Sequence, residues 1–306
     1  MRLLALCLAA CSAASETDPR WSVAAPLPER MQEMHAAVLH GRIYIAGGFN
    51  AANTASRAAL QYDPATNRWG AIADLPQARH HMPLAVAGDT LYAVGGLGPG
   101  TFAGEANLWL YREDVDAWEE RAPLPLGRGA SAVGVVNGKI IVVGGIGPTG
   151  AHVTATAVYD PATDTWEPGA SIPTARDHLT AAVVDGIVYA IGGRPHDANR
   201  NFDLVEAYDP AADSWSARRS MPSRRGGLAS AVLDGRIHTF GGETSSAVFA
   251  NHEVYDPVND SWSVAPALPT ARHGLGAAAT GGRLYTIGGG PRAGFAQTAV
   301  VEVFTP

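Results

Sequence analysis

One sequence pattern recurs six times along the 306 residues at a nearly constant spacing. In each copy an apolar segment ends in a pair of glycines: Gly47-Gly48, Gly95-Gly96, Gly144-Gly145, Gly192-Gly193, Gly241-Gly242 and Gly288-Gly289. The steps between successive pairs are 48, 49, 48, 49 and 47 residues. A repeat of this length is typical of one structural unit copied many times. The period therefore favours blades arranged around an axis over a string of separate domains.

A turn motif and a tryptophan follow the glycine pair. The turn is Tyr-Asp-Pro at residues 62–64, 159–161, 208–210 and 255–257, and tryptophans follow at Trp69, Trp118, Trp166, Trp215 and Trp262. Aspartate caps such a turn and proline presets its backbone angle, so the pair indicates a hairpin. The pattern predicts four antiparallel strands per repeat. We expect the glycines to allow close approach of neighbouring backbones, and the tryptophans to fill the gaps between blades.

The two ends of the chain each hold part of a repeat. Trp21 opens a tryptophan strand with no repeat before it, and residues 300–306 form a third strand with no tryptophan strand after it. We expect the first strand to complete the last blade, because this removes an open sheet edge. The predicted fold is all-β: a six-bladed β-propeller of four-stranded antiparallel blades over residues 21–306, with its ring closed by the N-terminal strand.

These motifs resemble the Kelch repeat family. The resemblance rests on the Gly-Gly pairs, the spaced Tyr and Trp, and the Leu-Pro-x-x-Arg connection between repeats, and it covers residues 21–306. Two copies depart locally: the second has Tyr111-Arg112-Glu113 in place of Tyr-Asp-Pro, and the sixth has Phe304. The resemblance, which is to exported bacterial Kelch propellers, implies that this connection lies at the mouth of the central channel.

The N-terminal segment differs in composition from the repeats. A positive residue, an apolar run and a small polar stretch predict a signal peptide or lipoprotein signal at residues 1–15 and a short linker at 16–20. Cys11 fits the acylated cysteine of a bacterial lipobox. We therefore expect a secreted or periplasmic protein, lipid-anchored if Cys11 is acylated. A disordered tail or a misplaced start codon is the alternative.

Charge and composition argue against several kinds of partner. The net charge is −7, and nucleic-acid-binding domains usually carry a basic face, so we expect no nucleic-acid partner. No apolar stretch reaches about 18 residues, so no transmembrane segment is expected. The two cysteines, Cys7 and Cys11, precede the repeats, which argues against thiol chemistry in the propeller. We expect a monomer with no cofactor and no metal ion.

The connection between repeats carries arginine at a fixed position. Four residues after the Leu, Ile or Met that precedes each proline stand Met31, Arg79, Arg128, Arg176, Arg225 and Arg272. The resemblance implies that these side chains face the channel mouth, where guanidinium groups would bind carboxylates in bidentate fashion. The alternative is that arginine belongs to the repeat itself and bonds neighbouring carbonyl groups or stacks between blades.

The residues just after this arginine position differ between repeats. They include Glu33 and His35, His80 and His81, Asp177 and His178, and His273, whereas the third and fifth repeats have Gly129 and Gly226-Gly227. Histidine at a channel mouth is suited to proton transfer or metal ligation. The alternative is a set of polar side chains bonded to water. The loops at residues 194–201 and 243–246 also vary, as specificity loops do.

Two functions agree with this pattern. The first is a binding module for another protein or an acidic small molecule, with the ligand held by Arg79, Arg128, Arg176, Arg225, Arg272, His80 and His273. The alternative is a periplasmic sugar-acid mutarotase that resembles the bacterial sialic acid epimerases, with Arg128 and Arg176 as anchors. Its candidate catalytic residues are His178, His81 and Glu33. The long insertion that the resemblance implies for those enzymes is missing, which favours binding without catalysis.

Overall fold

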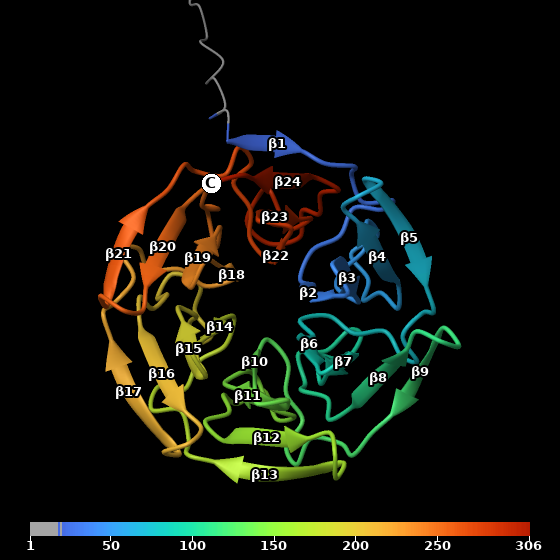
Figure 1. The fold of residues 1–306 in the computed structure, drawn as a ribbon, viewed down its shortest axis with the longest axis vertical. Helices are drawn as coiled ribbons and strands as arrows, with labels where there is room; N and C mark the ends of the chain where they lie inside the picture. Colours follow the sequence, from blue (N-terminus) through green and yellow to red (C-terminus); the bar gives the residue numbers. More distant parts are fainter. Residues whose placement is uncertain (1–17, 19) are drawn as a thin grey trace, which may run out of the picture.

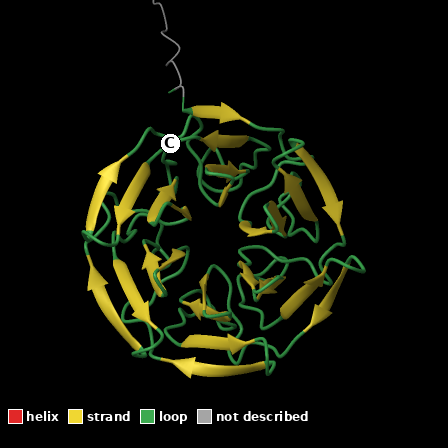
Figure 2. Cartoon of the chain, in the orientation of Figure 1, coloured by secondary structure: helices red, strands yellow, loops and turns green. Residues whose placement is uncertain are grey.

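The computed structural model describes residue 18 and residues 20–306, which form a ring of six sheets around a central axis (Figure 1). Every sheet has four antiparallel strands, and loops join the strands throughout the ring (Figure 2). The predicted six-bladed propeller is confirmed. Among the described residues, we find no helix of the length and apolar character that crossing a membrane requires. The predicted signal segment, with Cys7 and Cys11, lies outside the described residues.

The blades follow one another in chain order. Blade one comprises β2 (His35–Leu39), β3 (Arg42–Ala46), β4 (Ala59–Asp63) and β5 (Arg68–Ile72). Blade two comprises β6 (Leu84–Ala87), β7 (Thr90–Val94), β8 (Leu108–Arg112) and β9 (Ala117–Glu120). Blade three comprises β10 (Ala132–Val136), β11 (Lys139–Val143), β12 (Thr156–Asp160) and β13 (Thr165–Gly169).

The second half of the ring repeats this order. Blade four comprises β14 (Thr180–Val184), β15 (Ile187–Ile191), β16 (Val205–Asp209) and β17 (Ser214–Arg218). Blade five comprises β18 (Ala229–Leu233), β19 (Arg236–Phe240), β20 (His252–Asp256) and β21 (Ser261–Val264). Blade six comprises β22 (Gly276–Thr280), β23 (Arg283–Ile287), β24 (Val301–Phe304) and, from the start of the chain, β1 (Trp21–Val23).

The ring closes through the first strand, as predicted. β1 pairs antiparallel with β24, with Trp21 opposite Phe304 and Val23 opposite Glu302. In Figure 1, β1 lies on the outer side of β24, at the meeting point of the two chain ends. Closure leaves the inner strand of each blade facing the axis, so the central channel is bordered by β2, β6, β10, β14, β18 and β22.

Tryptophans join neighbouring blades, as predicted. Each indole N–H donates to a backbone carbonyl of the preceding blade's last strand or the segment after it: Trp69 to Ala25, Trp118 to Ala73, Trp166 to Ala122, Trp215 to Ala170, Trp262 to Arg219 and Trp21 to Pro266. The donor–acceptor distances are 2.9, 2.8, 2.7, 2.7, 2.9 and 3.1 Å, respectively. These bonds satisfy a polar atom that would otherwise be unpaired between packed sheets.

The glycine pairs serve close approach between blades. A Cβ atom on Gly47 would lie 2.6 Å from the carbonyl oxygen of Arg79, and the N–H of Gly48 donates to that same oxygen at 2.8 Å. Both glycines have positive φ, at 69° and 86°. Only glycine combines this backbone angle with such an approach, so the pair is structural in this fold.

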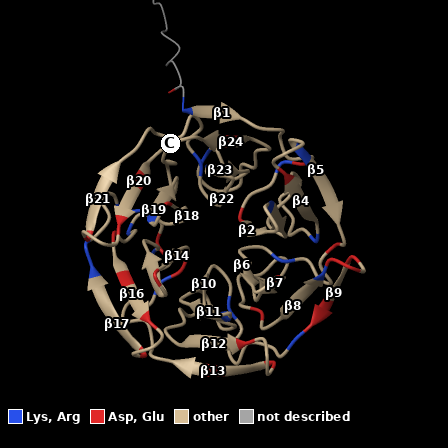
Figure 3. Cartoon of the chain, viewed as in Figure 1, with Lys and Arg blue, Asp and Glu red and all other residues tan. Residues whose placement is uncertain are grey.

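Charged side chains are scattered around the ring. Figure 3 shows Lys and Arg in separate short segments over all sectors, interspersed with Asp and Glu. The charges that matter for a site are those near the axis.

Candidate functional site

Six backbone hydrogen bonds form a closed circle around the channel. Each blade contributes the residue two positions after the arginine position, and we call this set the axial ring: Glu33, His81, Ala130, His178, Gly227 and Gly274. Each N–H donates to the carbonyl oxygen of the equivalent residue in the preceding blade, over 2.6–3.0 Å. All six have φ between 50 and 67°. This conformation is unfavourable for residues with a Cβ atom, and such strain often occurs at functional sites.

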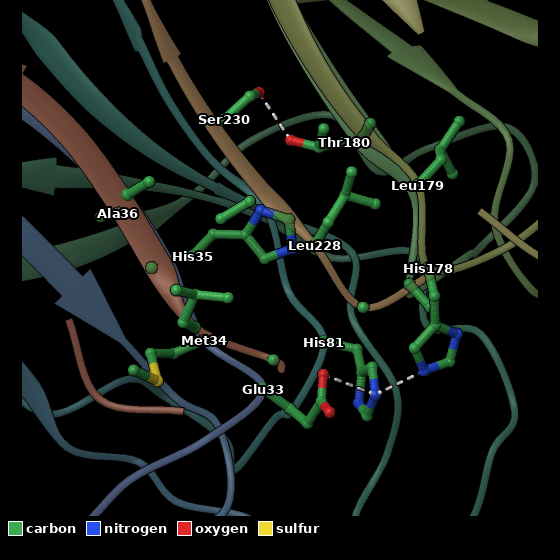
Figure 4. A pocket seen from close by; sticks show the side chains of 18 of the residues that line it. Glu33, Met34, His35, Ala36, His81, His178, Leu179, Thr180, Leu228 and Ser230 are labelled. Carbon is green, nitrogen blue, oxygen red and sulfur yellow. Dashed lines mark hydrogen bonds and ion pairs between the residues drawn. The ribbon is translucent and has the colours of Figure 1, made fainter. Parts of the chain in front are cut away.

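Three side chains of the axial ring converge above the channel. Nε2 of His81 lies 3.1 Å from Oε2 of Glu33 and 3.0 Å from Nε2 of His178, as Figure 4 shows. All three side chains are buried. The other positions hold Ala130 and two glycines, and a Cβ atom on Gly274 would collide with the carboxylate of Glu33. Ala130, Gly227 and Gly274 therefore leave space for the side chains of the three polar residues.

The tautomer of His81 follows from its neighbour His80. Nε2 of His80 lies 3.2 Å from the carbonyl oxygens of both Gly98 and Thr101, which only accept, so this nitrogen carries a proton. In the neutral ring its Nδ1 then accepts, and it lies 2.5 Å from Nδ1 of His81. Burial and the nearby His81 lower the pKa of His80 to about 3, which keeps its ring neutral. His81 therefore donates through Nδ1, and in the neutral ring the Nε2 that faces Glu33 and His178 is bare.

The tautomer of His178 is fixed in the same way from the opposite side. Its Nδ1 bonds to the carboxylate of Asp177, so Nδ1 carries the proton and Nε2 is bare. Burial and the Arg194 charge lower the pKa of His178, with Asp177 acting against them. Asp177 in turn accepts from Nε2 of His152 at 2.5 Å. Two bare imidazole nitrogens and a carboxylate oxygen thus face one another.

A circuit of ion pairs completes the site. Arg194 lies 3.4 Å from Asp177 and 2.8 Å from Glu243, and His273 lies 3.3 Å from Glu243 and 3.5 Å from Glu33. We call the connected groups the mouth network: Glu33, His81, Asp177, His178, Arg194, Glu243 and His273. Burial would raise the pKa of Glu33, but His81, His273 and His178 hold it well below its usual value. The three carboxylates of this network outnumber its one guanidinium by two, and a proton on any of its histidines offsets part of that excess.

The five arginines lie elsewhere than expected. Arg128, Arg176, Arg225 and Arg272 are at most 1% exposed and Arg79 is 4% exposed. Three of them pair with glutamates inside their own blades: Arg176 with Glu206, Arg225 with Glu253 and Arg272 with Glu302. Their placement corrects the expectation of an arginine-lined mouth. These three guanidinium groups turn into the blades because the carbonyl oxygen of the first glycine in a glycine pair accepts a hydrogen bond from each of them. Arg225, for example, donates to the carbonyl oxygen of Gly241 at 2.7 Å.

The other two arginines are also held within blades. The guanidinium of Arg79 lies over the Trp109 ring at 5.4 Å and 3.4 Å from Glu105. Arg128 donates to the carbonyl oxygens of Ala155 and Leu126 at 2.5 and 3.3 Å. Burial lowers the pKa of Arg128 to about 10. The alternative weighed for these arginines, bonding to carbonyls and stacking, therefore describes their surroundings.

The candidate histidines and carboxylates, unlike the arginines, do lie near the channel. The structure brings Glu33, His81 and His178 together, with His80 behind His81 and His273 between two glutamates. The variable loops supply Arg194 and Glu243. Sequence reasoning missed His152, which stands alone in the loop of blade three and meets Asp177 only in the fold. Its one sequence signal was its place after a glycine pair, where loops vary.

The channel at the axial ring contains a small cavity. This cavity has a volume of about 100 Å³ and is lined mainly by aliphatic side chains (Figure 4). Glu33, His81 and His178 line this cavity, and its other labelled polar groups are His35 and the Thr180–Ser230 pair, whose hydroxyls are 2.7 Å apart. Burial lowers the pKa of His35 to about 4. This volume suits a few water molecules, so a larger ligand must remain at the mouth.

An aromatic rim borders one side of the mouth. Phe49 stacks on His80 at 4.2 Å between ring centroids, and Phe102 meets His80 edge-on at 5.4 Å. Phe295 packs on Phe49 at 5.0 Å. Phe102 and Phe295 are 54% and 56% exposed, which is unusual for phenylalanine. The mouth therefore combines a polar network with an exposed apolar edge.

Comparisons with known proteins agree on the architecture. A family model described as Attractin/LZTR1 beta-propeller matches residues 43–296. Among solved structures, one titled "Structure of YjhT" superposes with a TM-score of 0.80 at 17% identity, covering 93% of this chain and 97% of that one. No curated protein matches in sequence. At this identity the superposition establishes the fold alone.

Proposed function

This chain belongs to the Attractin/LZTR1 β-propeller family, of Kelch type, and we propose that it is a binding module whose small ligand sits at the mouth of the central channel. The observation that carries the proposal is the convergence of Glu33, His81 and His178 from three blades. These residues occupy positions where the repeats differ, on a scaffold that is otherwise regular. Rigid scaffolds with individual polar groups at one end are the usual setting of binding sites.

The charge of the mouth network selects the ligand class. The sequence suggested an acidic ligand because five arginines were expected there, but those arginines are buried in the blades. Arg194, the guanidinium of the network, is already paired with Glu243 and Asp177. Three carboxylates against one guanidinium favour a cation, or a ligand with a cationic group, over a carboxylate. The exposed Phe102 and Phe295 would contact any apolar part of the ligand.

Thermal unfolding against a ligand panel tests this proposal. The panel contains amino sugars, alkylammonium ions, sugar acids, neutral sugars and divalent metal ions. A ligand at a hundred times its Kd adds about 2.7 kcal/mol to the free energy of unfolding. We expect stabilisation by cationic members, lost in Glu33→Gln and retained in His40→Ala, whose exposed histidine contacts Glu113 away from the mouth network. Absence of any shift across the panel would overturn the proposal.

A second candidate is the isomerisation of a sugar acid. The contact that favours it is the Glu33–His81 pair. With a proton on Nε2 of His81, this pair would supply the acid and the base that mutarotation needs within reach of the ring and anomeric oxygens. The anchors first considered for the substrate carboxylate, Arg128 and Arg176, are buried, which leaves only the already paired Arg194. The test follows anomer interconversion of a sugar acid by NMR. Catalysis that Glu33→Gln abolishes would favour the enzyme over the binding module.

We also propose export of the protein. Support comes from the composition of residues 1–15, and Cys11 would be the lipidated residue. Mass spectrometry of the protein from a bacterial host tests both points. Removal of residues 1–10 with a diacylglycerol adduct on Cys11 would establish a lipoprotein, and an unprocessed chain would contradict export.

A further inference from the structure

We propose that Glu33, His81 and His178 bind one divalent transition-metal ion at the mouth of the channel. This inference rests on the proposed function, because it names the ligand class of the same site. Each side chain offers one ligand atom, and the three atoms lie within 4.8 Å of one another.

The ligand nitrogens of His81 and His178 face each other. In the neutral rings both protons lie on Nδ1, so the two Nε2 atoms, 3.0 Å apart, meet lone pair to lone pair. The Glu33 carboxylate, which also only accepts, stands 3.1 Å from one of them. Such an arrangement in a buried place is repulsive unless a positive centre lies between the three atoms. The candidates for that centre are a proton on one imidazole and a metal ion.

The two distances from Nε2 of His81, to Glu33 and to His178, are close to those within one coordination sphere. A zinc ion 2.0–2.1 Å from each of two ligands in a tetrahedral site holds those ligands about 3.3 Å apart. The distances of 3.0 and 3.1 Å are slightly shorter, so an ion would enter with small side-chain movements. Two imidazole nitrogens and one carboxylate oxygen suit zinc, iron(II), cobalt or nickel, whereas magnesium and calcium prefer oxygen ligands.

The outer partners are those that metal-bound histidines need. A ligating imidazole almost always donates its second N–H to a carboxylate, carbonyl or water, which fixes the ring and raises its basicity. Asp177 accepts this bond from Nδ1 of His178, and Nδ1 of His80 accepts it from Nδ1 of His81, while Nε2 of His80 donates to backbone carbonyls. Two histidines with outer partners of this kind, aimed at the same carboxylate, distinguish the cluster from an accidental group of polar residues.

Two neighbouring groups are less suited to an ion. The His152–Asp177–His196 group uses the carboxylate that supports His178, and Arg194 lies 3.4 Å from that carboxylate. The Glu33–Glu243–His273 group contains Glu243, which pairs with Arg194 at 2.8 Å. A guanidinium in contact with a ligand repels a metal cation. Among the described clusters, the Glu33–His81–His178 group is the one whose ligand atoms have no such contact.

The three ligand side chains line the small cavity at the axial ring, which leaves room beside them. Ala130, Gly227 and Gly274 occupy the other places in the axial ring and extend no polar side chain toward the centre. Three protein ligands leave at least one position for water or for a donor atom of a second ligand, as in catalytic rather than structural sites. A divalent ion would also offset the excess of carboxylates over guanidinium in the mouth network.

Cobalt and zinc titrations test the inference. Metal-stripped, untagged protein is titrated with CoCl₂ at pH 7.5 while the visible absorption is followed, and with ZnCl₂ by calorimetry, with MgCl₂ as the control ion. We expect one ion per chain and no binding of magnesium. His178→Ala should weaken zinc binding at least 100-fold, and Asp177→Asn should weaken it about 10- to 100-fold by loss of the outer partner. His40→Ala, the matched histidine control, should bind as the unchanged protein does.

Outcomes separate this inference from the proposed function. Unfolding curves without metal establish that each variant is folded before it is titrated. Zinc binding that survives in both His178→Ala and His81→Ala overturns the metal site, as does the lack of any ion that binds more tightly than magnesium. If organic cations still stabilise the metal-stripped protein and Glu33→Gln removes that effect, the proposed function stands without the metal. If neither metals nor organic ligands bind, both fail.

Discussion

Two positions that lie two residues apart in every repeat have different surroundings in this propeller. The first holds arginine in five of six repeats, and every one of these side chains is buried in a blade. The second is the axial ring, where Glu33, His81 and His178 meet above the channel. A residue type that recurs from blade to blade is explained by packing that the blades share. A residue that departs from the repeat can instead form a site that occurs once in the molecule.

We call the five buried arginines, Arg79, Arg128, Arg176, Arg225 and Arg272, the arginine layer. The residues around them show which side chains can fill the interior of a blade. Arg176 pairs with Glu206, and the fifth and sixth blades repeat this pair. In blade one the equivalent positions are Met31 and Leu60, which belong to one apolar cluster. The same geometry is thus filled by an ion pair or by two apolar side chains. A buried ion pair of this kind is replaceable as a unit, while removal of one partner is not tolerated.

The largest expected effect comes from splitting one of these pairs. Arg176→Ala leaves the carboxylate of Glu206 buried and unpaired, and we expect a loss of about 3–5 kcal/mol in the free energy of unfolding. The double variant Arg176→Met with Glu206→Leu copies blade one and should recover most of this loss. Urea unfolding measures both. If the double variant is no more stable than the single one, the arginine layer does more than fill the blade.

An intermediate effect should come from a histidine that departs from the repeat without joining the site. His252 is buried against Trp21 and Phe304, and burial together with His238 lowers its pKa to about 3. Its ordinary pKa in the unfolded chain is about 6.5, so the unfolded state binds the proton more readily and stability falls as pH drops below about 6.5. Between pH 6.5 and 5 this histidine should cost about 2 kcal/mol.

Comparison of the unchanged protein with His252→Phe isolates this contribution. The free energy of unfolding is measured at pH 7 and pH 5 for both proteins. We expect the unchanged protein to lose about 2 kcal/mol more than the variant over this interval. Equal losses of free energy in the two proteins would mean that His252 does not titrate as a buried residue. They would contradict the view that this histidine only packs inside its blade.

The smallest expected effect concerns the glycine opposite Glu33. Gly274 and Gly281 have nearly the same φ, 54° and 58°, but a Cβ atom meets Glu33 at the first and nothing within 4 Å at the second. Both substitutions to alanine should cost about 1–2 kcal/mol through backbone strain. Only Gly274→Ala should also displace Glu33 and so reduce metal-dependent stabilisation. Equal ligand responses in the two variants would contradict the role of Gly274 in making room for Glu33.

Much of the fold could be read from the sequence, because the glycine pairs, turns and tryptophans repeat with a fixed period. The pairing of β1 with β24 followed from the incomplete repeats at the two ends. Glu33, His81 and His178 were recognised as candidates because they break the repeat. Their convergence was not predictable, since it depends on the positive φ of the axial ring and on the circle of backbone bonds.

The predicted location of the arginine side chains was wrong. Their number and spacing were read correctly, but the direction of a side chain depends on which acceptors lie within reach. The carbonyl oxygens of Gly192 and Gly241 accept from Arg176 and Arg225, respectively, and no spacing rule reveals them. His152 was missed for a related reason, because its partner Asp177 is 25 residues away in the chain and adjacent only in the fold.

The central claim is that the axial ring binds and the arginine layer only supports the fold. Cobalt titration of three metal-stripped proteins tests it most directly: the unchanged protein, His178→Ala, and the double variant Arg176→Met with Glu206→Leu. We predict visible cobalt absorption at one ion per chain in the unchanged protein and the double variant, and none in His178→Ala. Equal cobalt absorption in His178→Ala, or its loss in a folded double variant, would contradict the account.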